Sequence, residues 1–350
     1  VRRFAAARID RLSADWFATT ESINQELRGD LDRLRARGRD LANNNDYGRK
    51  FVRLCQDNII GPGGIRLQSR VKDTGGSPDR MAAQAIEAAW TKWQAVADVT
   101  GRQHLVEMLR TGVGGLPSDG EFLLRIVTGR NAGNSFGMAL QLIDVDRIDT
   151  SYNVALAEGH RVQMGIETNS YGRPEAVHLF VGHPRDGIGS NRERVRVPMS
   201  NLIHCYRRDR PDQLRGLPWM TPGMLSLHHL GNFKLSALLA AEHGANHFGF
   251  FTTPDGQAEV VSTGTDDGTA DGGYVMEADA GTFQTLPDGV KFESFNPDYP
   301  TAMYADFVKA NLRGIASGLG VAYHSLANDL EGVSFSSIRS GTLEERDRWA

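Results

Sequence analysis

The spacing of apolar residues changes twice along this chain, and these changes restrict the folds that it can adopt. Apolar side chains such as Leu27, Leu31 and Leu34 recur at three- or four-residue steps, as on one face of a helix. Helical spacing returns after Pro218, whereas the middle of the chain consists of short runs rich in β-branched and aromatic residues. The chain is therefore predicted to have an α+β fold.

Five short runs in the middle of the chain are predicted to be strands. The connections between them contain glycine, asparagine or proline and are too short for crossover helices, which favours an antiparallel, meander-like sheet. The runs are Glu121–Thr128, Met138–Ile143, Glu175–Val181, Arg194–Val197 and Leu202–Tyr206.

Helical segments are predicted before this sheet region. Ser77 followed by Pro78 fits an N-cap with proline in the first turn, and Trp90 and Trp93 then follow at helical spacing. We expect these tryptophans to face the core rather than to stack nucleic-acid bases. In the basic run from Arg33 to Asp40 we expect most arginines on the solvent side of a helix.

Two long helices are predicted to flank a small acidic insert. The residues from Met224 to Phe233, and again from Tyr304 to Leu319, show apolar steps of three and four. Between them, Asp255 to Asp298 has ten acidic residues and one lysine, with strand-like pieces at Gly273–Met276 and Val290–Phe295. We expect this insert to be a small β unit with too few apolar residues to form its own core.

The composition excludes several classes of protein. The 350 residues carry 39 Lys and Arg against 43 Asp and Glu, a net charge of −4, so bulk charge does not draw the protein to nucleic acid or anionic membranes. With 40% hydrophobic residues, the chain has the composition of a folded protein. Cys55 and Cys205 are too few for a disulfide framework or a zinc site by themselves, and we expect two buried thiols in a reducing compartment.

No segment is predicted to enter a membrane. The most apolar stretch, Leu225 to Phe251, contains Lys234, Glu242 and four histidines, so we expect it to pack against protein. The start of the chain lacks an apolar core of signal-peptide length, so export is not expected. Val1 is not an initiator methionine and Thr342 to Ala350 has the pattern of the first turns of a helix, so we expect the sequence to be incomplete at both ends.

One motif would fit an enzyme. Gly133 to Gly137 matches the G-x-S-x-G pattern, in which Ser135 would be a nucleophile on a strand-to-helix turn. Both flanks are predicted strands, however, which places Ser135 at the tip of a hairpin. We therefore expect no catalytic residue.

No metal or cofactor is expected either. His243 and His247 have the spacing of two zinc ligands on a helix but lack a third ligand, and we expect structural roles for them. Asp144 and Asp146 lack the rest of a calcium loop and fit a turn or a helix cap. The chain has no G-x-x-x-x-G-K-[ST] motif, so any ATP-driven step would belong to a partner.

Four stretches resemble, in order, the phage portal proteins of the lambda family. They are Leu34 to Arg66, Asp119 to Glu121 with the following LQLIDVDRID, VPMSNLIHCYRRDRPDQLRGLPWMTP, and GIASGLGVAYHSLANDLEGVSFSSIRSGTLEERDR. The third stretch contains Gln213, Arg215 and Gly216, and the fourth contains Ser336, Ser337 and Arg339. The resemblance implies structural roles for these six residues, and it implies that a crown-forming end is missing from this sequence.

The resemblance also implies a ring, usually dodecameric, at one capsid vertex, through which double-stranded DNA is packaged and later ejected. Residues 1–215 would then form the wing, 216–250 (Leu217 to Phe248) and 298–320 the stem helices, 251–297 the clip, 321–336 the tunnel loop, and 337–350 the start of a truncated helix. The acidic residues expected to meet partners in the clip are Asp266, Asp267, Asp271, Glu277 and Asp279.

The partners that the resemblance implies are further copies of the chain, the terminase large subunit, the major capsid or scaffold protein and a head-tail connector. It implies a place in the virion, after assembly in the cytoplasm of a bacterial host.

The residues of the expected tunnel loop suit a DNA channel. A conduit must not bind its cargo tightly, and each Lys or Arg placed on a phosphate adds affinity through counterion release. Residues 323–337 contain no Lys or Arg. We expect a loop that exits the helix at Gly318–Gly320 and ends at a helix capped by Ser336. It would line the channel with Tyr323, His324, Ser325, Asn328, Asp329, Glu331 and Gly332.

Two other functions stay open at this point. One is another ring-forming virion or tail connector protein, and the other is a serine hydrolase that uses Ser135.

Overall fold

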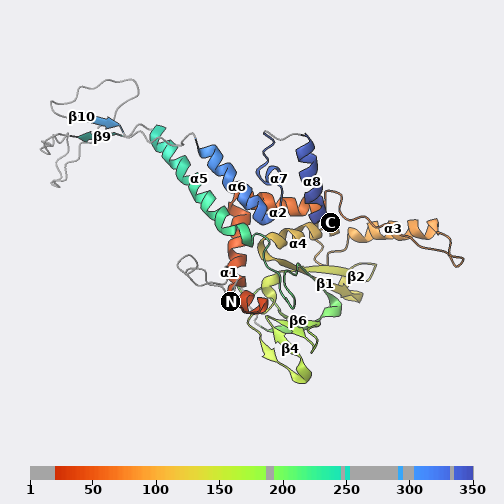
Figure 1. Ribbon diagram of the computed structural model, residues 1–350. Coiled ribbons are helices and arrows are strands. Elements are labelled where there is room, and N and C mark those ends of the chain that lie inside the picture. Colours follow the sequence, from red (N-terminus) through yellow and green to blue (C-terminus); the bar gives the residue numbers. More distant parts are fainter. Residues whose placement is uncertain are drawn as a thin grey trace, which may run out of the picture. The chain divides into compact units, whose positions relative to one another are not determined.

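The computed structural model describes residues 20–186, 193–245, 249–252, 291–294, 303–331 and 335–349. The chain forms two units (Figure 1), one made of Val1–His228 and Leu312–Ala350 and the other of His229–Asn311. Among the described residues, no helix is both long and apolar enough to span a bilayer.

The helices that precede the sheets are bounded by capping residues. Ser22 caps α1 (Ile23–Asn44), and Asn45 caps α2 (Asp46–Ile59) by accepting hydrogen bonds from two amides of its first turn. A capping box begins α4 (Leu105–Asp119), which packs against both α1 and α2. The helical spacing in this part of the sequence is therefore confirmed.

The start predicted for the helix between α2 and α4 is wrong. The helix α3 (Arg80–Gln94) is capped by Asp79, whose carboxylate accepts a hydrogen bond from an amide of the first turn at 3.0 Å. Pro78 instead pairs with Lys72 in a short antiparallel bridge. This pairing keeps the backbone extended up to the residue before Asp79, so the helix cannot begin at Pro78.

Two expectations about burial hold only in part. Trp93 is buried, with 7% exposure, but Trp90 is only half-buried. In the basic run, Arg33 and Arg37 are exposed as expected, whereas Arg35 is 2% exposed because it continues the apolar stripe of α1.

The strands form antiparallel sheets, as predicted, but two large sheets rather than one. In the first, β1 (Glu121–Thr128) lies between β2 (Met138–Ile143) and β8 (Leu202–Tyr206). The second has the order β3 (Val154–Ala155), β4 (Arg161–Gln163), β5 (Ile166–Thr168), β6 (Pro174–Phe180) and β7 (Arg194–Pro198). The first three of these were not predicted, because two or three residues are too few to show alternation.

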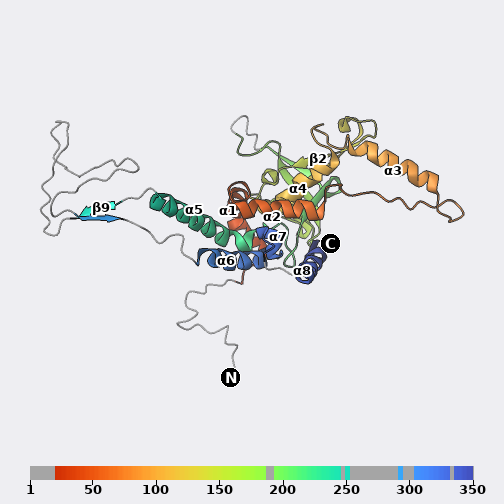
Figure 2. The same ribbon diagram turned by 90° about the horizontal axis from the view of Figure 1, so that it is seen from above.

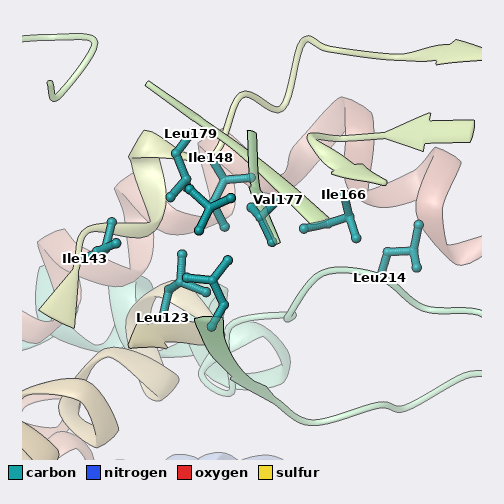
Figure 3. Packing of buried hydrophobic residues seen from close by; sticks show 9 residues of the cluster. Leu123, Ile143, Ile148, Ile166, Val177, Leu179 and Leu214 are labelled. Carbon is teal, nitrogen blue, oxygen red and sulfur yellow. The ribbon is translucent and has the colours of Figure 1, made fainter. Parts of the chain in front are cut away.

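One hydrophobic cluster joins the two sheets (Figure 3). Leu123 from β1 and Ile143 from β2 meet Ile166 and Val177 of the second sheet, and all four are 4% exposed or less. The cluster also contains Ile148, Leu179, Val197, Leu202 and Leu214. Leu214 belongs to the segment between β8 and α5, so this core holds the middle of that segment.

The first of the two predicted long helices, α5 (Met224–Ala245), starts later than predicted. Trp219 and Met220 donate their backbone amides to the carbonyls of Leu116 and Pro117 near the end of α4, so they cannot serve as the first turn of α5. A 3-10 turn, Thr221–Gly223, leads into the helix instead. Residues 246–248, at its predicted far end, lie outside the described residues.

The second predicted long helix is α6 (Tyr304–Leu319), and its apolar stripe at helical spacing is confirmed. Within the smaller unit, Phe233 of α5 stacks on Tyr304, with ring centroids 5.7 Å apart, and also meets Phe307 at 4.9 Å. Residues 298–302, where the helix was predicted to begin, lie outside the described residues.

The described part of the acidic insert is a pair of short strands. The strands β9 (Gly249–Thr252) and β10 (Lys291–Ser294) pair antiparallel, which confirms the strand predicted at Val290–Phe295. Residues 253–290 lie outside the described residues, and with them the strand predicted at Gly273–Met276 and all five acidic clip residues named above. The roles of those residues stay predictions.

Candidate functional site

A glycine ends α6 at the start of the predicted tunnel loop. Gly320 has a φ of 66°, its amide donates to the Ser317 carbonyl at 3.1 Å, and the Val321 amide donates to the Ala316 carbonyl at 3.0 Å. This pair of bonds is a Schellman motif, which requires left-handed backbone at the glycine. The predicted end of the helix at Gly318–Gly320 is confirmed.

The segment that follows contains a short helix, so the expectation of a continuous loop is wrong. The helix α7 (Tyr323–Ala327) is anchored by Leu326, which is 1% exposed. Asn328 then ends α7 with a φ of 53°. A helix of five residues with one fully buried leucine is too short to show helical periodicity in the sequence.

Hydrogen bonds hold three of the predicted channel residues against protein. Tyr323 Oη donates to Asp329 Oδ2 at 2.8 Å, and Asp329 Oδ1 accepts from the Glu331 amide at 2.9 Å. Burial and the bond to Asp329 raise the pKa of Tyr323 to about 12. Ser325 Oγ donates at 2.7 Å to Glu345 Oε2 of α8 (Phe335–Trp349). These bonds fix α7 to its own C-terminal turn and to α8.

The residues of this segment that remain in contact with solvent follow α7. Asn328 and Glu331 are exposed, and Leu330 between them is 63% exposed. His324 is half-buried, and Gly332 lies outside the described residues. The predicted set therefore divides into an anchored part, residues 323–327 and Asp329, and an exposed turn.

The helix predicted to be capped by Ser336 begins at Phe335. Ser336 and Ser337 therefore lie in its first turn. The prediction that Ser336 caps the helix is wrong, because a capping residue precedes the first helical residue. The side chains of both serines lie outside the described residues, and Arg339 is exposed on α8.

A buried glutamate joins segments that are far apart in the sequence. Glu121 is 1% exposed; its Oε1 accepts hydrogen bonds from Arg215 Nε at 2.8 Å and Nη2 at 2.6 Å, and its Oε2 accepts from the Gly216 amide at 2.8 Å. Arg35 of α1 also donates to Oε1, and His204 Nε2 of β8 lies 2.9 Å from Oε2. Burial opposes ionisation of Glu121, but Arg215, Arg35 and His204 outweigh it and hold its pKa well below the usual value.

Gln213 and Arg215 shape the connection from β8 to α5 through backbone contacts. Gln213 Oε1 accepts from the amides of Asp209 and Arg210 at 2.9 and 3.2 Å, and its Nε2 donates to the Arg215 carbonyl at 2.8 Å. Arg215 Nη1 donates to the Met164 carbonyl at 2.8 Å. Both side chains are at most 1% exposed, and these contacts are those that a structural role requires.

Gly216 lies against the backbone at the end of α4 and has no room for a side chain. A Cβ added to Gly216 would lie 2.1 Å from the Gly120 carbonyl oxygen. We therefore expect Gly216→Ala to lower the free energy of unfolding by about 1–3 kcal/mol, as overpacking does. Urea denaturation followed by circular dichroism measures this change. Gly314→Ala, where a Cβ meets nothing within 4 Å, is the control, and an equal loss in both variants would contradict the steric argument.

A second ion network fixes α1 beside the end of α4. Arg39 Nε donates to Asp119 Oδ1 at 2.6 Å, and its Nη1 donates to Asp146 Oδ2 at 2.5 Å. Burial raises the pKa of Asp119, which Arg39 and Arg35 offset only in part. At Asp146 burial acts in the same direction, but the bonds and charge of Arg39 outweigh it and lower the pKa.

Two clusters of histidine and carboxylate side chains were considered as metal sites, because the possible ligand atoms within each cluster lie close to one another. They are Asp144, Asp146 and His183, and His160, Glu167 and Glu175. In the first, Arg39 already pairs with Asp146, and in the second Arg196 donates to both oxygens of Glu167 at 2.7 and 2.8 Å. Since the arginines already compensate this negative charge, we assign both clusters as ion-pair networks. His247 and the side chain of His243 lie outside the described residues.

Ser135 lies in the connection between β1 and β2, as predicted, and not on a strand-to-helix turn. The Asn134 side chain holds this connection by donating to the carbonyls of Val96 and Met138 at 3.0 and 2.8 Å. We therefore expect Ser135→Ala to leave assembly unchanged, measured by gel filtration. A fluorophosphonate probe is expected to leave Ser135 unlabelled, and labelling detected by mass spectrometry would contradict this assignment.

Several residues that hold these elements together were not predicted to do so, among them Glu121, His204 and Glu345. For Arg35 a signal was present, because it lies four residues after Leu31 on the apolar stripe of a helix. A buried arginine on such a stripe implies a buried acidic partner. Nothing in the sequence indicates which of the 43 acidic residues that partner is.

Comparison with known proteins places these features in a family. Residues 10–350 match the model of the family described as phage portal protein, lambda family. The probable portal protein of Halomonas phage phiHAP-1 is 37% identical over 355 residues, which cover 99% of this chain and 68% of the relative. Portal protein B of Escherichia phage lambda is 24% identical, with 96% and 67% covered.

A solved structure shares the fold. A chain in the neck of an empty GTA particle superposes with a TM-score of 0.50 and 15% identity, over 91% of this chain and 78% of that one. The fold similarity and the sequence matches agree, and this chain belongs to the lambda family of phage portal proteins.

Proposed function

We propose that this protein forms the portal of a tailed-phage or prophage capsid, a ring at one vertex through which double-stranded DNA is packaged and ejected. The observation that carries this proposal is the match to the portal family from residue 10 to residue 350. The hairpin setting of Ser135 removes the argument for a serine hydrolase.

The order of elements supports an assignment of successive segments of the chain to different parts of the portal. Residues 1–215, with both large sheets, would form the wing and meet the major capsid or scaffold protein. Residues 216–250 and 298–320, which contain α5 and α6, would form the stem. The insert between them, 251–297, would form the clip that docks the terminase large subunit and later a head-tail connector.

The exposed turn after α7 is the part of the chain that we propose to meet DNA. Residues 323–331 contain no Lys or Arg, so this segment offers phosphates no cation to bind. Tyr323, Asp329 and Ser325 hold its base through the hydrogen bonds described above, which leaves Asn328, Leu330 and Glu331 at its surface. A fixed base with a tip that carries no cation would constrict a channel without retaining DNA.

The assembly state tests the proposal directly. We expect the purified protein to form rings with a central hole, imaged by negative-stain electron microscopy, with a matching large species in gel filtration. A cyclic ring of identical subunits requires two different surfaces per chain to meet head to tail. A monomer at micromolar concentration would contradict the portal function.

A further inference from the structure

An apolar surface on the larger unit is exposed in the part of the chain that the structure describes. The helix α3 and the loop before it extend outward from the rest of this unit in both views (Figures 1 and 2). Large apolar side chains on α3 and on the nearby β1–β2 connection are exposed, among them Ile86 and Phe136, each at 43%. Contiguous exposed apolar surface of this kind marks interaction sites in soluble proteins.

These side chains line a groove of about 320 Å³. Its walls are Leu67 from the loop, Ile86, Trp90 and Trp93 from α3, and Phe136 and Met138 from the hairpin. The walls are held in place: Trp93 Nε1 donates to the Met138 carbonyl at 2.9 Å, and the two indole rings pack with centroids 5.0 Å apart. A preformed apolar groove of this size suits a few apolar side chains of a helix.

Basic side chains outnumber acidic ones in the segment that carries the loop and α3. Residues 61–103 contain six basic side chains, all of them exposed, and none makes an ion pair with the described part of the chain. They are Arg66, Arg70, Lys72, Arg80, Lys92 and Arg102. Arg66 and Arg70 flank Leu67 in the loop, and Lys92 adjoins Trp93 on α3.

The four acidic residues of the same region are already engaged by backbone amides. Asp73 accepts from Gly75 and Ser77, and Asp79 caps α3. Glu87 accepts from Ser69 at 2.9 Å, and Asp98 accepts from residues 100, 102 and 103. The region therefore has six basic side chains outside the ion pairs of the described residues, against four carboxylates that accept hydrogen bonds from backbone amides.

We propose that this groove binds an amphipathic helix of a partner protein, with its apolar stripe against the tryptophans and acidic side chains toward the six cations. The apolar walls explain why a helix is favoured over nucleic acid, whose phosphates would find the cations but leave the groove unfilled. The proposal concerns a surface of the wing and does not depend on how the channel handles DNA.

Binding of designed peptides tests the groove. The probes are a synthetic helical peptide of about five turns with leucines on one face and glutamates on the other, a matched peptide with lysines for glutamates, and a scrambled peptide. Fluorescence anisotropy of the labelled peptides on the full chain is expected to show binding of the acidic helix about tenfold tighter than of either other peptide. Equal binding of all three, or none, would overturn the proposal.

Variants on one helix separate the groove from its surroundings. Ile86→Asp places a charge in the groove and is expected to weaken the acidic peptide by about tenfold or more, whereas Met81→Asp, at an 83% exposed position outside the groove, leaves it unchanged. Arg70→Glu with Lys92→Glu is expected to reverse the preference toward the lysine peptide. Circular dichroism shows whether each variant is folded.

The same protein and its variants test two other possible occupants of the groove, DNA and a second copy of the chain. If a DNA duplex displaces the acidic peptide, the surface binds nucleic acid and the proposal fails. If Ile86→Asp blocks ring formation in gel filtration while Met81→Asp does not, the groove is covered by a second copy of the chain, and the proposal fails in that way.

Discussion

Glu121→Gln is expected to lower the free energy of unfolding by about 3–5 kcal/mol, because it leaves buried Arg215 without its carboxylate partner and, among the described ion pairs, buried Arg35 with only Asp146, 3.7 Å away. Arg35 and Arg215 are 2% and 0% exposed, so water cannot replace the lost carboxylate. Glutamine keeps the shape of the side chain, and the loss therefore measures charge and hydrogen bonding rather than packing. The midpoint of urea denaturation, followed by circular dichroism, reports it.

Glu167→Gln is the matched control, since Glu167 is also buried and pairs with an arginine. Its partner Arg196 has a 49% exposed side chain, so water stabilises the arginine when the pair is broken. We expect a loss of about 1 kcal/mol, typical of a pair that reaches solvent. A Glu121→Gln loss no larger than this would show that burial of the arginines does not matter.

The pH dependence of stability has the sign set by lowered carboxylate pKa values. A carboxylate with a lower pKa in the folded than in the unfolded state stabilises the fold above its unfolded pKa, and this contribution is lost as the pH falls through the folded pKa. For Glu167, whose bonds to Arg196 lower its pKa from 4.5 to about 2, the loss falls between these two values. The contribution of Glu121 is lost in the same direction, and Glu121→Gln should flatten the acid limb of the stability curve.

The elements that the sequence predicts well are those whose periodicity is long enough to see. The α6 stripe runs from Tyr304 to Leu319, and β1 and β2 are apolar-rich runs of eight and six residues, so each is long enough to be recognised. By contrast, α7 has five residues and β3 has two, and their conformations depend on contacts made after the chain folds. Leu326 and the Ser325–Glu345 bond belong to such contacts.

The candidate site was predictable only in outline. The glycines that end α6 have a local signature, and the lack of Lys and Arg after them can be read directly from the chain. The division of that segment into anchored and exposed residues depends on hydrogen bonds across 20 positions, as between Ser325 and Glu345. Likewise, Arg35 and Glu121 are 86 residues apart, and spacing gives no indication that they meet.

Lysines placed on the exposed turn after α7 are expected to stall DNA packaging. Leu330→Lys with Glu331→Lys is preferred to substitution of Asp329, because Asp329 accepts the hydrogen bond of Tyr323 and supports the end of α7. For each new phosphate contact, the logarithm of the binding constant falls more steeply with the logarithm of the salt concentration, by about 0.9 in slope. In a ring this change is repeated in every subunit, so DNA held in the channel should resist sliding at low salt and be released as salt rises.

The rate of DNA entry into capsids, measured at low and high salt with rings of normal size, decides this prediction. Leu330→Gln with Glu331→Gln removes the same side chains without adding cations, and it should package at the parental rate. Met81→Lys with Gln84→Lys places the same number of lysines on α3, where both residues are exposed, and it should also package normally. If the lysines at 330 and 331 package as fast as either control at low salt, the turn after α7 does not line the DNA path. The anchoring bonds of Tyr323 and Ser325 would then have only a structural role, since they would hold a turn that meets no DNA.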